Sequence, residues 1–242
     1  MQLPGVNASS QVYVDYGDHV EGAAEAWSEA EVITDAQKQT IKEVLTVVGP
    51  AVAAVRAANG ATEDAARKVN KARASFGVRD VILDRRVMAL SDAVLNGPAG
   101  RDRQSNAYKQ VFLNEKPHEI TGGNMREEPE VVEVLLARYD AAPDFDGKKE
   151  ARGVVQGALV KSIEAREVLD AAEMAENKAA DAEIQARLTL RAALEQAYGK
   201  LRAAFPGRRD FIESFFPRRD RAASKKGEGD EPAPAPGAPT GG

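Results

Sequence analysis

Apolar residues recur at helical spacing along most of this chain. The first stripe consists of Ile41, Leu45, Val48, Val52 and Val55. Steps of three and four residues place these side chains on one face of a helix. Gly49 and Pro50 interrupt the stripe, and a proline inside a helix removes a hydrogen bond and clashes with the preceding turn. The pattern therefore predicts a helix over residues 35–58 that is kinked or broken near Pro50 and ended by Asn59-Gly60.

Two further helices are predicted between residues 62 and 141. Thr62 is suited to cap a helix over 62–95, whose buried face consists of Val69, Phe76, Leu83 and Leu90. Asn96-Gly97-Pro98 ends it, and residues 98–127 are irregular apart from a short helix near 107–112. A helix over 129–141 then begins with Pro129 in its first turn.

The longest predicted helix covers residues 148–205. Alanine recurs in it every seven residues, at Ala158, Ala165, Ala172, Ala179, Ala186 and Ala193. Small residues on one side of a helix let a partner helix approach closely, as coiled-coil packing requires. A single helix of this length is ~87 Å long at 1.5 Å per residue. The alternative is a hairpin that turns at residues 176–178; we favour the single helix because a turn would break the seven-residue phase.

A short amphipathic helix is predicted over residues 207–216. Four phenylalanines and one isoleucine gather here, at Phe205, Phe211, Ile212, Phe215 and Phe216. They either fold back over the end of the bundle or dock in the groove of another subunit. We favour the first interpretation and keep the second as a candidate interaction site.

The two ends of the chain differ from this helical body. Residues 1–33 contain a β-like run at residues 11–16 and are expected to form a short extended arm. Residues 218–242 are basic and then rich in proline and glycine, so we expect them to be disordered. The predicted fold is all-α: an antiparallel, coiled-coil-like helical bundle over residues 34–217 between these two ends.

Composition and charge limit the cellular locations and the kinds of binding partner that we expect for this chain. The chain has 242 residues, a net charge of −5 and no cysteine, which excludes disulfides and cysteine-ligated zinc. Its most apolar stretch, residues 44–58, is short and interrupted, so we expect no transmembrane segment and a cytoplasmic location. The candidate basic patch consists of Arg208, Arg209, Arg218, Arg219, Arg221, Lys225 and Lys226. We interpret it as a solubilising flank of the tail, and binding to nucleic acid or to an anionic surface is the alternative.

Motifs for catalysis, metals and cofactors are missing from the sequence. The two histidines, His19 and His118, lie in segments predicted to be irregular, and the one Glu-x-x-His match, at residues 115–118, contains a proline. Neither a Gly-x-Ser-x-Gly motif nor a phosphate-binding loop occurs. We therefore expect no cofactor, no metal and no catalytic residues. An enzyme with an unmarked carboxylate site remains an alternative, and a deep pocket that holds carboxylates with raised pKa would be its sign.

These patterns favour a non-enzymatic structural or interaction protein that associates with itself or with a protein partner. No other predicted helix is as long as the helix over 148–205, so a monomer would leave part of the alanine seam uncovered. The alternative from another class is an adaptor that binds nucleic acid or an anionic membrane through its basic segment, with an affinity that falls steeply with salt.

Overall fold

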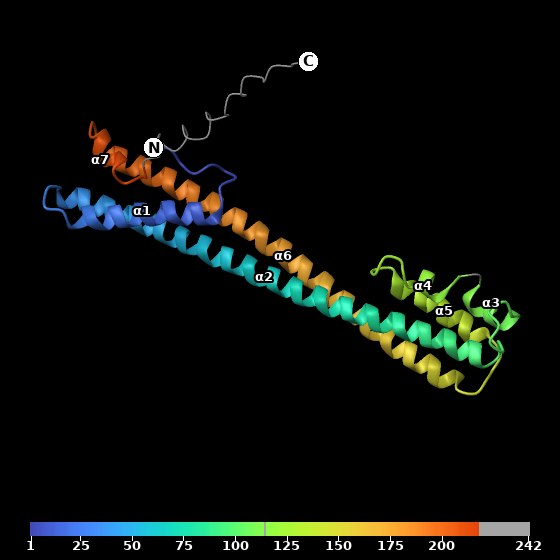
Figure 1. Cartoon of the computed structure of the whole chain (residues 1–242). Helices are drawn as coiled ribbons and strands as arrows, with labels where there is room; N and C mark the ends of the chain where they lie inside the picture. The colour runs from blue at the N-terminus through green and yellow to red at the C-terminus, as the bar shows by residue number, and fades with distance from the viewer. Residues whose placement is uncertain (114, 218–242) are drawn as a thin grey trace, which may run out of the picture. The chain divides into compact units, whose positions relative to one another are not determined.

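The computed structural model describes residues 1–113 and 115–217, and the regular structure of these residues is helical (Figure 1). The helices are α1 (Ser10–Glu29), α2 (Asp35–Asn96), α3 (Asn106–Phe112), α4 (Pro117–Ile120), α5 (Glu128–Ala141), α6 (Lys148–Ala204) and α7 (Arg209–Glu213). The all-α prediction is confirmed. Helix α6 is a single helix over the predicted range, without a turn at residues 176–178.

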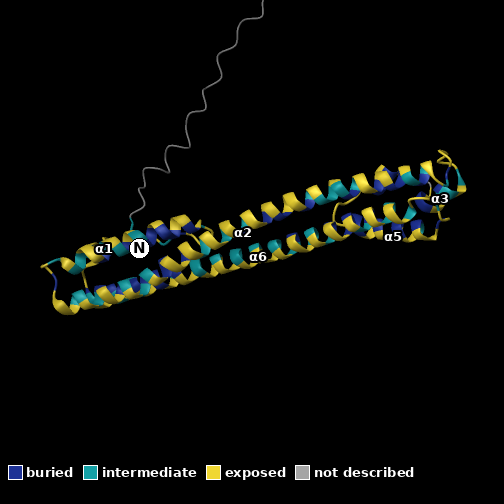
Figure 2. Cartoon of the chain, turned by 90° about the horizontal axis from the view of Figure 1, so that it is seen from below, coloured by how far each residue is buried: buried dark blue, intermediate teal, exposed yellow. Residues whose placement is uncertain are grey.

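The described residues form two compact units. Unit 1 comprises residues 1–56 and 186–217, and unit 2 comprises residues 57–185. Both long helices contribute to both units, because α2 and α6 each cross a unit boundary. Each unit has a hydrophobic core of its own, and the buried sides of its helices face their neighbours (Figure 2).

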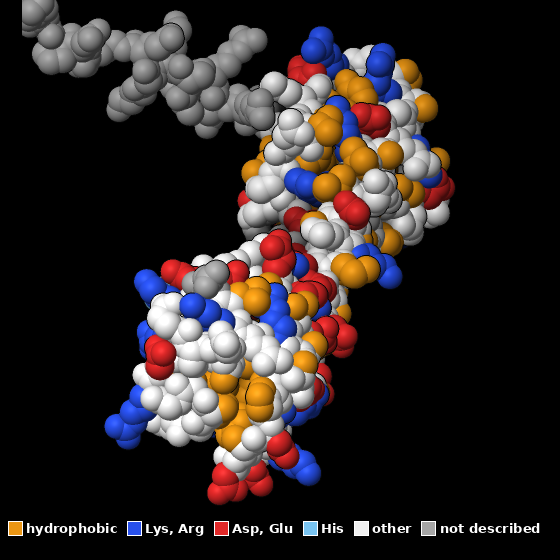
Figure 3. All heavy atoms as spheres, turned by 90° about the vertical axis from the view of Figure 1, so that its right-hand side faces the viewer, with side chains coloured by type: hydrophobic (Ala, Val, Ile, Leu, Met, Phe, Trp, Pro, Cys, Tyr) orange, Lys and Arg blue, Asp and Glu red, His pale blue; other side chains and the backbone are white. Residues whose placement is uncertain are grey.

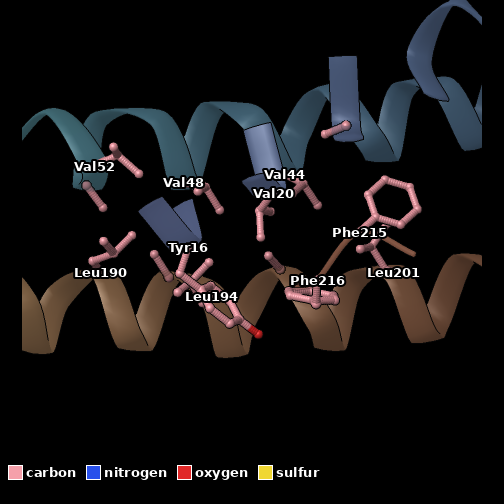
Figure 4. Packing of buried hydrophobic residues seen from close by; sticks show 14 of the residues in the cluster. Tyr16, Val20, Val44, Val48, Val52, Leu190, Leu194, Leu201, Phe215 and Phe216 are labelled. Atoms are coloured by element: carbon pink, nitrogen blue, oxygen red, sulfur yellow. The ribbon is translucent and has the colours of Figure 1, made fainter. Parts of the chain in front are cut away.

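Unit 1 packs α1, the first part of α2, the end of α6 and α7 around one core. Helices α2 and α6 run antiparallel here, so that Val52 lies opposite Leu190 while Val44 lies near Leu201 (Figure 4). Tyr16 and Val20 of α1 fill the space between them. The segment before α1 is held to α6 by Arg187 and Arg191, which donate hydrogen bonds to the backbone oxygens of Ala8 and Pro4, both at 2.6 Å.

The prediction of an extended N-terminal arm is wrong, because residues 10–29 form helix α1. Ser9 caps this helix by accepting a hydrogen bond from the Val12 N–H. The alternation of residues 11–16 resembles a strand, but the buried positions recur at helical spacing from Tyr13 through Val20 to Ala24. Packing against α2 and α6 therefore outweighs the local β preference of the valines and tyrosines.

The prediction of two separate helices, with a kink or break near Pro50 and an end at Asn59-Gly60, is wrong, because α2 is one helix. It continues through Pro50 and through Asn59-Gly60 to Asn96. Thr62 donates to the Ala58 carbonyl inside the helix instead of capping a new one. A mid-helix glycine costs only about 1 kcal/mol, and the buried Val55 and Val69 on either side stabilise the continuous helix.

Unit 2 pairs the rest of α2 with the first part of α6 and packs α3, α4 and α5 against their ends. Its larger core includes Leu83 and Leu90 of α2, Leu135 of α5 and Leu159 of α6. Tyr108 of α3 joins this core and forms a buried hydrogen bond with Ser91 of α2 at 2.9 Å. A smaller cluster farther along the same pair of helices consists of Val69, Ala72, Phe76 and Leu169.

Helix α2 is also, among the described helices, the one that is long and apolar enough to cross a membrane by length and composition, because an 18-residue window within it has a mean hydropathy of 1.4. The core helix of a soluble protein passes the same test. Of that window, 28% is buried. In unit 1, Ile41, Val48, Val52 and Val55 of the apolar stripe are buried in the core, and Leu45 is half-buried.

Candidate functional site

The alanine seam of α6 is covered within the chain. Ala158 packs in the larger core of unit 2, and Ala165 and Ala172 pack on the smaller cluster around Phe76. In unit 1, Ala193 belongs to the core and Ala186 packs against it, whereas Ala179 is half-buried. The partner of the seam is α2, which has 62 residues against 57 in α6. The expected uncovered part of the seam is therefore not found in the described structure.

The phenylalanine-rich segment belongs to the core of unit 1. Phe205, Ile212, Phe215 and Phe216 are buried, and Phe211 packs against them. Trp27 of α1 lies edge-on to Phe211, with ring centroids 4.5 Å apart, and its Nε1–H donates to Ser214 Oγ at 3.1 Å. The segment thus joins α7 to α1. Helix α7 itself, Arg209–Glu213, is shorter than the predicted 207–216.

Only the first two residues of the candidate basic patch are described. The guanidinium of Arg208 lies over the Phe211 ring at 4.8 Å, and Arg209 forms an ion pair with Glu213 at 2.7 Å. Arg218, Arg219, Arg221, Lys225 and Lys226 lie outside the described residues. A hollow of about 500 Å³ opens beside the patch and is lined by Tyr198, Arg202, Phe205, Pro206, Gly207, Arg209 and Ile212.

A group of three carboxyl side chains in unit 2, one buried and two half-buried, was not predicted. Asp80 and Asp84 lie one turn apart on α2, and the side chain of Glu128, the first residue of α5, lies close enough to both for their carboxyl groups to interact. Glu128 is only 3% exposed. One oxygen of each of the three carboxyl groups is closed to solvent and has no hydrogen-bond partner among the described residues. We call Asp80, Asp84 and Glu128 the carboxyl cluster.

The surroundings of Glu128 keep this side chain protonated. Burial, and after it the two neighbouring aspartates, together raise the pKa of Glu128 from the ordinary value of 4.5 to about 9. Burial also raises the pKa of Asp80, and the negative charge of the neighbouring Asp84 acts in the same direction. A hydrogen bond between two carboxyl groups requires a proton on one of them. The raised pKa of Glu128 favours this residue as the carrier of the proton at neutral pH.

Two arginines around the start of α5 are paired with other acidic residues. Arg126, just before α5, forms ion pairs with Asp170 and Glu173 of α6, both at 2.7 Å. Arg166 of α6 forms an ion pair with Glu130 and donates to the Arg126 carbonyl. These arginines fasten the start of α5 to α6 and leave the carboxyl cluster without a counter-ion among the described residues.

Few chemical roles fit the geometry of the carboxyl cluster. Its closed oxygens have no contact with solvent, so a substrate does not reach them in this structure. Within the described residues, no three His, Asp or Glu side chains have the arrangement of a metal site. The arrangement is suited to holding a proton and to joining two helices.

A sequence signal for the cluster exists in the spacing of the buried face of α2. Phe76, Asp80, Leu83 and Val87 follow one another at steps of four, three and four residues, so that Asp80 occupies a position of the apolar stripe. A carboxylate at such a position is a sign of a buried polar contact. Glu128 has no comparable signal, because an acidic residue in a first helical turn is commonplace.

Comparison with known protein families, with curated protein sequences and with solved structures finds no match to this chain.

Proposed function

We propose that this chain is a non-enzymatic helical interaction protein that self-associates, and that a second copy docks on the outward side of α2 in unit 2. The support is a second apolar stripe on this helix. Val78, Val81 and Met88 are 59%, 47% and 42% exposed, unlike the buried Leu83 and Val87 between them.

The spacing of this stripe is that of a coiled coil. Residues 74, 78, 81, 85, 88 and 92 follow at steps of four, three, four, three and four, and they are Ala74, Val78, Val81, Arg85, Met88 and Asp92. At roughly 100° per residue, these positions lie on the side of α2 away from its buried stripe. We call them the outer stripe.

A second copy is the partner that this pattern suits best. Two identical stripes with the same steps match each other in a symmetric contact, in which the same surface of each copy is used. Scattered apolar side chains occur on the surface of both units, among acidic and basic groups (Figure 3). Single exposed residues of this kind are ordinary in soluble proteins, whereas Val78, Val81 and Met88 share one face of α2 at heptad spacing, with Arg85 between the last two.

Light scattering coupled to size-exclusion chromatography of the full chain tests the proposal. We expect a dimer or a larger assembly of the wild type at micromolar concentration, and a monomer when Val78→Glu and Val81→Glu are combined, because both charges would be buried at the contact. The matched control is Val168→Glu on α6, since Val168 is 60% exposed and lies in the same unit outside the outer stripe. Circular dichroism verifies that each variant remains helical.

Two results would contradict the proposal. One is a wild-type monomer at both low and moderate salt. The other is an assembly that Val168→Glu disrupts as strongly as the double variant. An assembly lost at moderate salt would instead favour the basic segment as the contact, because charge-driven binding weakens with ionic strength.

A further inference from the structure

We propose that Asp80, Asp84 and Glu128 form a buried site that holds one proton and thereby joins the start of α5 to α2. Two helices supply the groups: Asp80 and Asp84 lie on adjacent turns of α2, and Glu128 comes from α5. The ligand is a proton, and the site is separate from the outer stripe on which the proposed function rests.

This inference rests on the burial of Glu128 and on its position beside the two aspartates. Glu128 is more than nine-tenths buried, its side chain lies beside both aspartates, and its Oε1 is closed to solvent without a hydrogen-bond partner among the described residues. Three ionised carboxylates in one buried place would repel one another and lose their hydration without compensation. One proton removes a charge and supplies the hydrogen bond that links the two helices.

The charged groups on the elements around Glu128 are paired with other residues or belong to the carboxyl cluster itself. On α2, the groups that face Glu128 are Asp80 and Asp84. On α6, Arg166 and Asp170 are paired with Glu130 and Arg126. Glu127 accepts a hydrogen bond from Asn124. The titratable groups of α4 are His118 and Glu119, and Glu119 accepts a hydrogen bond from the Lys116 N–H.

The linkage between protons and folding follows from the pKa of Glu128. In an opened α5, Glu128 returns to solvent and releases its proton near the ordinary pKa of 4.5, whereas the closed state keeps it up to a pKa of about 9. The site therefore stabilises the closed state fully below pH 4.5. Its contribution falls as pH rises from 4.5 to 9 and is constant above that range.

Hydrogen exchange of the α5 amides between pH 6 and 8 measures this linkage. The intrinsic exchange rate rises about tenfold per pH unit, and release of one proton on opening adds about another tenfold per unit. We expect a slope of about two for the logarithm of the rate in the wild type and of about one in Glu128→Gln, whose amide donates to the aspartates without titrating. The control Glu133→Gln, at an exposed position of α5, keeps the wild-type slope.

Infrared spectroscopy of the unmodified chain gives a second readout that needs no variant. A protonated carboxyl band is expected at pH 7 and disappears as pH passes about 9, the pKa of Glu128. A wild-type exchange slope of one, or a spectrum at pH 7 without a protonated carboxyl, overturns the proposal. Neither result bears on self-association through the outer stripe, so the two proposals fail separately.

Discussion

At the scale of single residues, Gly17 shows how closely α1 approaches α2. It is buried in α1, and a Cβ atom at this position would overlap with Cγ2 of Val52. Gly22, on the same helix, is exposed and would meet no atom within 4 Å. The absence of a side chain at residue 17 therefore sets the distance between the two helices.

These two glycines predict opposite effects of the same substitution. Gly17→Ala is expected to destabilise the protein by about 1–3 kcal/mol, because the added methyl group forces α1 away from Val52. Gly22→Ala is the matched control and is expected to stabilise it by about 0.5–1 kcal/mol, since alanine loses less backbone entropy in a helix. Urea denaturation followed by circular dichroism measures both. Equal stability of the two variants would mean that α1 is not seated on α2 as described.

The carboxyl cluster is the part of the molecule that residue patterns could predict only in part. Asp80 falls on the buried stripe of α2, so its burial was accessible from spacing. That Glu128 meets it depends on where α5 packs after an irregular connection, and such a contact across 48 positions of sequence has no local signature. The six alanines show the converse case: their spacing predicts a close helical partner but does not say that the partner is α2 of the same chain.

At the scale of elements, α2 contains a proline that its packing tolerates. Pro50 is exposed and lies inside the helix, where it cannot donate a hydrogen bond to the Thr46 carbonyl. The buried positions on either side, Val48 and Val52, are part of the unit 1 core. Burial of such side chains contributes roughly 1.5–3 kcal/mol each, which offsets the local cost of the proline.

Replacement of this proline is expected to stabilise unit 1. Pro50→Ala restores one backbone donor and a good helix former, so the melting temperature should rise, corresponding to about 1–3 kcal/mol. The converse variant, Ala53→Pro, places a proline at an exposed position three residues further along and should destabilise the protein by about 3 kcal/mol or more. Thermal melts of both variants test the pair. A loss of stability in Pro50→Ala would contradict the view that packing merely tolerates this residue.

A helix end could be predicted where helix-terminating residues coincide with the point at which the helix stops packing against its neighbours. Asn96-Gly97-Pro98 ends α2 as expected, because the chain turns there toward α3. Asn59-Gly60 carries a similar local signal, yet the helix continues because buried residues stand on both sides of it. Local propensities of about 1 kcal/mol decide an end only where tertiary contacts do not.

At the scale of the whole molecule, the two units differ in how the chain builds them. Unit 2 is one continuous stretch, residues 57–185, whereas unit 1 combines the segments before and after it. The hydrogen bond from Trp27 to Ser214 joins residues 187 positions apart, and the bond from Arg191 to Pro4 spans the same separation. Contacts of such separation require closure of a long loop, which is entropically unfavourable and slows their formation.

Trp27 consequently has a spectroscopic use. It is the one tryptophan of the chain and lies beside Phe211 and Phe215, so its fluorescence reports on unit 1 alone. After dilution from denaturant, we expect the far-ultraviolet circular dichroism signal, which sums all helices, to rise before the Trp27 emission reaches its native value. Coincident signals would mean that both units fold in one step. A lag would measure, without an added label, how long the chain takes to bring α1 into contact with α7.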